Sequence, residues 1–88
     1  MNLSISHPTD RPNFTVVYLG RLTVWFSYQT AVGFQLDWLD PVVRQNGWGP
    51  TTGKHLNYID GGSSEAKTRR VYGETFDEQF VEVMRNAF

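Results

Sequence analysis

The clearest pattern in the chain is an alternation of apolar and polar positions that starts at Phe14. The runs are rich in aromatic and β-branched side chains, which is typical of strands. Gly20-Arg21 and Gln29-Thr30 supply short turns between them. Gly33 interrupts the third run, as at a bulge or a point of close approach. The alternation predicts three consecutive antiparallel strands: residues 14–19, 22–28 and 31–36.

The end of the chain changes to a helical period. Thr75 and Glu78 match the Thr-x-x-Glu capping box, which predicts a helix over residues 75–88. Its apolar positions recur three and four residues apart, and they are Phe76, Phe80, Val83, Met84 and Ala87. We therefore predict an α+β fold, a small antiparallel sheet of three to five strands with the C-terminal helix packed on one face.

The remaining segments complete one domain over residues 1–88. Residues 1–13 are expected to form an N-terminal arm or an edge strand, because Leu3 and Ile5 alternate but prolines follow. Residues 14–60 hold the sheet and a motif loop, in which 54–59 fits a strand or a helical turn equally well. Residues 61–74 begin with Gly, Gly, Ser and Ser and are expected to be a flexible connector.

Composition limits the classes of function. The 88 residues contain no cysteine, so disulfides and thiolate metal sites are excluded. No apolar run approaches a membrane span, and the N-terminus lacks a signal-peptide pattern, so we expect a soluble protein of the cytoplasm, which is the host cytoplasm if the chain is phage-encoded. A net charge of −1 creates no global field toward nucleic acid, and any electrostatic role must be local.

The densest group of chemically useful residues follows Trp48. Gly53-Lys54 invites comparison with a phosphate-binding P-loop, but only three residues separate Gly49 from Gly53 where that motif has four. Two interpretations stay open, a structural loop over Trp48 and a polar or anion-binding surface. The candidate binding residues of this segment are Trp48, Thr51, Thr52, Lys54, His55 and Asn57.

Nothing in the sequence predicts catalysis, a metal or a cofactor. His7 and His55 are the only histidines, and they lack metal-ligand spacing. No Gly-x-Ser-x-Gly nucleophile elbow is present. A second candidate binding group is the cationic cluster of Lys67, Arg69 and Arg70, which could meet phosphates together with Lys54.

The segment from Trp48 to Asn57, with its Trp-x-x-Thr-Thr-Gly-Lys-His-Leu-Asn motif, resembles a family of small uncharacterised proteins of phages and prophages, over about residues 14–60. The resemblance implies a small non-enzymatic protein that binds a host or phage protein and modulates or inhibits an assembly, including one of host defence. The alternative is a nucleic-acid or anion-binding module centred on residues 51–57 and 67–70. A marginal core and unpaired sheet edges further predict a homodimer.

Overall fold

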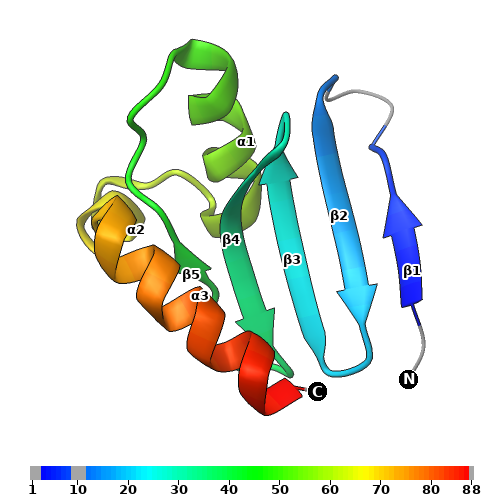
Figure 1. Ribbon diagram of the computed structural model, residues 1–88. Coiled ribbons are helices and arrows are strands. Elements are labelled where there is room, and N and C mark those ends of the chain that lie inside the picture. Colours follow the sequence, from blue (N-terminus) through cyan, green and yellow to red (C-terminus); the bar gives the residue numbers. More distant parts are fainter. Residues whose placement is uncertain (1–2, 9–11, 88) are drawn as a thin grey trace.

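A five-stranded antiparallel sheet organises the protein. The computed structural model describes residues 3–8 and 12–87. The strands lie side by side in the order in which they occur in the chain, and every neighbouring pair is antiparallel (Figure 1). The strands are β1 (Leu3–Ser6), β2 (Phe14–Leu19), β3 (Leu22–Ser27), β4 (Thr30–Leu36) and β5 (Val42–Val43). The predicted meander is confirmed. Strand β1 lies where an edge strand was expected near Leu3 and Ile5, and β5 extends the sheet at its other end.

Three helices follow the sheet: α1 (Pro50–Asp60), α2 (Ser64–Thr68) and α3 (Gly73–Ala87). The α+β class and the helix at the C-terminus are confirmed. Helix α3 crosses the face of β4 and β5 that is turned to the viewer in Figure 1, whereas α1, which the sequence did not predict, lies behind the sheet. The helices therefore cover opposite faces of the sheet.

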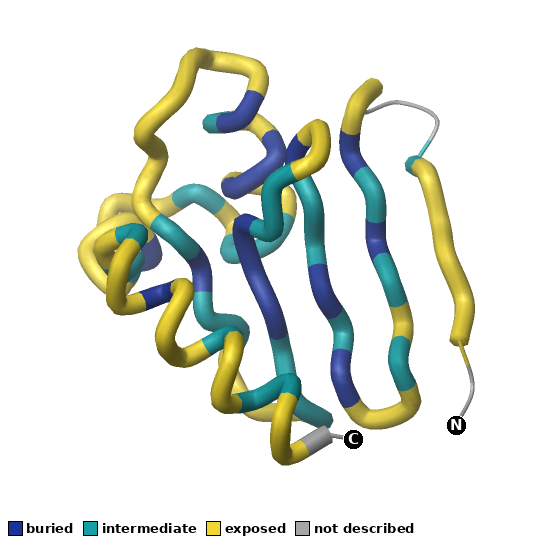
Figure 2. Tube along the Cα trace, viewed as in Figure 1, coloured by how far each residue is buried: buried dark blue, intermediate teal, exposed yellow. Residues whose placement is uncertain are grey.

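The face under α3 carries the larger core. Leu22, Val24 and Phe34 alternate along β3 and β4 and meet Phe76 of α3. Dark blue stretches of the tube in Figure 2 mark the buried parts of these strands. The Phe76 ring lies 5.4 Å from that of Phe34 and 6.0 Å from that of Phe80, as measured between centroids. Phe80, Val83 and Met84 pack around this cluster, so the helical period identified the buried face correctly.

The face under α1 holds a second core. Val32 and Val43 of the sheet pack against Leu56 of α1, with Trp25 and Ile59 at the border. Gly33 is the predicted point of close approach, since a Cβ atom there would lie 3.0 Å from the Ile59 Cδ1 atom. The pairing of β3 with β4 also shifts register beside it, between Trp25 and Phe26. Strands β3 and β4 are consequently buried on both faces.

Several local expectations need correction. The motif segment is helix α1 and not a loop, and this settles the ambiguity over residues 54–59. The segment 61–74, expected as a flexible connector, contains α2 and the start of α3. Helix α3 begins at Gly73, where the Phe76 N–H donates to the Tyr72 carbonyl, so Thr75 does not cap it. Among the helices that the structure describes, none has the length and apolar character of a bilayer span.

Replacing Phe76 tests whether α3 is a structural layer. Phe76 is completely buried, so Phe76→Ala removes a ring from the centre of the core and should cost about 3–5 kcal/mol of unfolding free energy. The matched control is Val81→Ala on the exposed side of the same helix, which should change stability little. Urea unfolding measures both, and equal midpoints for the two variants would contradict the packing.

Candidate functional site

Helix α1 divides the candidate residues of the motif between two environments. The helix begins at Pro50. Proline lacks an N–H, but the first N–H groups of a helix have no acceptor within the helix, so nothing is lost there. Thr52 and His55 lie on the buried side with Leu56, whereas Thr51, Lys54 and Asn57 are exposed. The motif therefore does not present one continuous polar surface.

The buried side of α1 forms a polar cluster with β3. The Ser27 Oγ atom lies 2.7 Å from His55 Nδ1 and 3.0 Å from Thr52 Oγ1. His55 Nε2 lies 3.1 Å from the Pro12 carbonyl oxygen, which can only accept a hydrogen bond, so Nε2 carries the proton. In the neutral imidazole Nδ1 then accepts from the Ser27 hydroxyl, and Ser27 in turn accepts from Thr52.

This cluster is shielded from solvent. His55 is 2% exposed, and its ring stacks on Phe14 at a centroid distance of 4.8 Å. A buried, mutually satisfied set of polar groups orients the elements that carry them. Thr52 and His55 thus fix α1 to β3 and to the segment that precedes β2, and they are not available to a large ligand.

The cationic residues also separate. Arg70 is drawn inward, with a side chain only 7% exposed, and its guanidinium donates to both Asp60 carboxylate oxygens at 2.8 and 2.9 Å. It also donates to Asn57 Oδ1 at 3.1 Å. Lys67 and Arg69 remain exposed, and Arg69 forms a 3.6 Å ion pair with Glu65. Arg70 therefore ties α1 to the segment after α2, and it does not join a surface patch.

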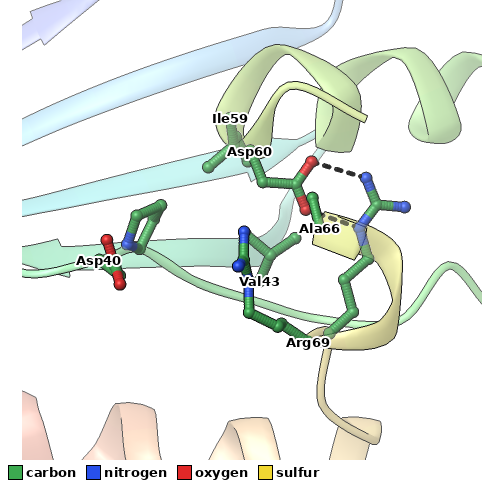
Figure 3. A pocket seen from close by; sticks show the side chains of 8 residues that line it. Asp40, Val43, Ile59, Asp60, Ala66 and Arg69 are labelled. Atoms are coloured by element: carbon green, nitrogen blue, oxygen red, sulfur yellow. Dashed lines mark hydrogen bonds and ion pairs between the residues drawn. The ribbon is translucent and has the colours of Figure 1, made fainter. Parts of the chain in front are cut away.

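The Asp60–Arg70 pair lines a hollow of about 220 Å³ between the end of α1, strand β5 and the region of α2 (Figure 3). Asp40 and Pro41, which follow β4, form another part of its wall, and Arg69 contributes a second guanidinium. The hollow thus has two carboxylates and two guanidinium groups in its lining. It lies beside the loop that connects β4 to β5.

That loop, residues 37–41 and here named the Trp38 loop, carries the most conspicuous apolar exposure in the described residues. Trp38 is 89% exposed and Leu39 is 58% exposed. Trp38 is not among the binding residues predicted from the sequence. The available signal was an apolar pair between Asp37 and Asp40 in a turn, where polar residues are usual.

The backbone of the Trp38 loop is held by hydrogen bonds at Asp37 and at Leu39. The Arg21 guanidinium donates to the Asp37 carboxylate, with Nε 2.9 Å from Oδ2, and the Asp37 N–H donates to the Arg21 carbonyl at 2.7 Å. The Leu39 N–H donates to the Leu36 carbonyl, and the Gln35 amide donates to the Leu39 carbonyl at 2.8 Å. Asp37 takes a left-handed conformation with φ of 53°. The backbone on either side of the exposed Trp38 is therefore held in place.

Comparison with known proteins assigns the chain to a family. A small α+β domain with a sheet between helices is a class that hosts many functions, so the class alone assigns none. The chain belongs to the family of unknown function DUF8033, whose model matches residues 3–78. The match spans the whole sheet, α1, α2 and the start of α3. No curated protein and no solved structure matches the chain. No group of three metal-ligating side chains occurs in residues 3–8 and 12–87.

Single substitutions on α1 test the division of the motif. His55→Ala removes the stacked ring and leaves the buried Ser27 hydroxyl without its acceptor, so we expect a loss of roughly 3 kcal/mol in unfolding free energy. Lys54→Ala, one residue away but exposed, should lie within about 0.5 kcal/mol of the parent. Thermal unfolding compares them, and an unchanged His55→Ala midpoint would rule out the structural role of the cluster.

The Asp60 carboxyl gives the protein a defined pH dependence. Its burial acts to raise its pKa, but hydrogen bonds from Arg70 and from the Gly62 N–H outweigh this effect, so the pKa lies below its usual value. Ionised Asp60 therefore stabilises the fold above the unfolded-state pKa of about 3.9, and this stabilisation is lost as the pH falls through the lower folded-state pKa.

Asp60→Asn should thus be less stable than the parent at neutral pH, and the difference should shrink below about pH 4 because the variant has no carboxyl to titrate. Asp40→Asn is the control, because Asp40 lines the same hollow but is exposed and has no ion pair among those the structure shows in the described residues. Urea unfolding across pH 2.5–7 measures the difference in unfolding free energy between Asp60→Asn and the parent. A difference that stays constant over this range would contradict the assignment.

Proposed function

We propose that this protein is a non-enzymatic protein-binding module that contacts its partner through the Trp38 loop. The observation that supports this most is the exposure of Trp38 on a braced support. Tryptophan provides the largest apolar contact area of any side chain and dominates binding energy in protein interfaces. An anchor that is already fixed loses little conformational freedom when it binds.

The surroundings of the loop suit a protein interface. Leu39 extends the apolar contact, and the hollow beside Asp40 and Pro41 offers charged groups of both signs for orienting polar contacts. An apolar centre with a polar border is the usual composition of such an interface. The partner would bury the indole and meet the hollow with its own polar groups.

The proposed partner is a protein of a bacterial host or of a virus that infects it, and binding would modulate or inhibit an assembly in the cytoplasm. The resemblance of the motif from Trp48 to Asn57 to small phage proteins supports testing this class of partner first. The alternative, binding of nucleic acid, has the exposed cations Lys54, Lys67 and Arg69 in its favour. It is weaker because Arg70 is neutralised by Asp60.

Affinity capture from bacterial lysate, with and without nuclease, tests the proposal. A captured protein should persist after nuclease treatment and in high salt, and Trp38→Ala should reduce its recovery at least tenfold. Tyr72→Ala is the matched control, because Tyr72 is a similarly exposed aromatic residue outside the Trp38 loop, and it should leave recovery unchanged.

Two outcomes would contradict the proposal. Recovery that falls equally for Trp38→Ala and Tyr72→Ala would show that the Trp38 loop is not the contact. Material that disappears with nuclease, or in a Lys54→Ala, Lys67→Ala and Arg69→Ala triple variant, would favour the nucleic-acid alternative.

A further inference from the structure

The two edges of the sheet differ in whether their backbone hydrogen-bonding groups have partners. At one edge, the Val71 N–H donates to the Val43 carbonyl at 2.9 Å, and Val71 accepts from the Gln45 N–H at 2.8 Å. Residue 71 thus adds a short parallel bridge beside β5 and closes that edge. At the other edge, β1 pairs only with β2 among the described residues, and all four of its residues are exposed (Figures 1 and 2).

Strand β1 is short but has the apolar, uncharged composition of an edge that pairs. Leu3 and Ile5 are 64% and 56% exposed and share one face, while Ser4 and Ser6 occupy the other. The strand has no charge and no proline, the residues that commonly block edge pairing. An uncharged edge meets a second copy of itself without placing like charges side by side.

We propose that β1 pairs antiparallel with β1 of a second copy, giving a symmetric dimer with one continuous ten-stranded sheet. The occupant is a second copy because each protomer has a single open edge in the part of the chain described. Pairing of the two open edges leaves none, so assembly stops at two. This proposal does not depend on the function of the Trp38 loop.

Symmetry restricts the register of the pair. An antiparallel pair of identical strands in one sheet is related by a two-fold axis perpendicular to the sheet, so each face continues as the same face of the partner. Two directly opposed residues must then point to the same face, so their residue numbers are both odd or both even. The central residue of β1, either Ser4 or Ile5, therefore faces its own copy across the axis. In both cases Leu3 and Ile5 of the two copies meet on the α3 side.

The dimer changes what the protein can bind. By the pairing of β1 with β2, Leu3 lies beside Leu19 and Ile5 beside Val17. Two copies would join these apolar rows into one strip between the two α3 helices. The two-fold axis would also place the two Trp38 loops at opposite ends of the sheet. If the Trp38 loop binds a partner, the dimer presents two anchors and gains avidity for a repetitive assembly.

Sedimentation equilibrium from low micromolar to near-millimolar concentration tests the dimer. We expect the mass of the parent to rise toward twice that of one chain. Ile5→Lys puts two like charges near the axis and should weaken association at least tenfold, whereas Val81→Lys, at an exposed position of α3, should associate like the parent. A strictly monomeric parent, or an Ile5→Lys variant that associates like the parent, would overturn the proposal.

A second measurement covers the case in which Ile5→Lys disturbs folding. Because the chain has no cysteine, Ser4→Cys and Ile5→Cys each introduce a single thiol per copy. Opposed residues of paired strands lie within disulfide range, so one of the two variants should cross-link into a dimer under mild oxidation while folded. If neither cross-links faster than Val81→Cys, β1 does not pair with itself and the proposed dimer is ruled out.

Discussion

The structure depends on the burial of β3 and β4 on both faces. Leu22, Val24 and Phe34 point to one helix layer, while Trp25 and Val32 point to the other. A chain of 88 residues has little interior. Because two strands lie at its centre, both of their faces contribute buried apolar surface. Each helix is needed because a bare apolar face of these strands would lie in water. The positions of α1 and α3 follow from that requirement.

Two interactions convert this layered packing into a fixed geometry. The hydrogen bonds among Ser27, Thr52 and His55 set the position of α1 on the sheet, and the Asp60–Arg70 pair ties the end of α1 to the segment after α2. Breaking either leaves a buried polar group without its partner, which costs more than the net gain of forming it. These polar contacts therefore act mainly by excluding other arrangements of the helices.

The sequence predicted the strands and α3 because their buried positions are apolar and follow one period. It did not predict α1, although Thr52, His55, Leu56 and Ile59 have helical spacing. Two of those four positions are polar, and the stretch begins with Pro, Thr, Thr and Gly, residues with weak helix propensity. The polarity was read as a binding surface, whereas in the fold it meets Ser27 of β3. Only the tertiary partner distinguishes the two.

The same reasoning explains why the Trp38 loop was not identified and why its exposure is informative. Local pattern treats an aromatic residue as core, and Trp25 and Phe76 fulfil that expectation. Trp38 departs from it, since Trp38 is 89% exposed while Arg21, Leu36 and Gln35 hold the backbone on either side of it. These hydrogen bonds order the backbone around an apolar side chain that lies in water. In a small domain with little stability in reserve, such an arrangement favours a role in contact with another molecule.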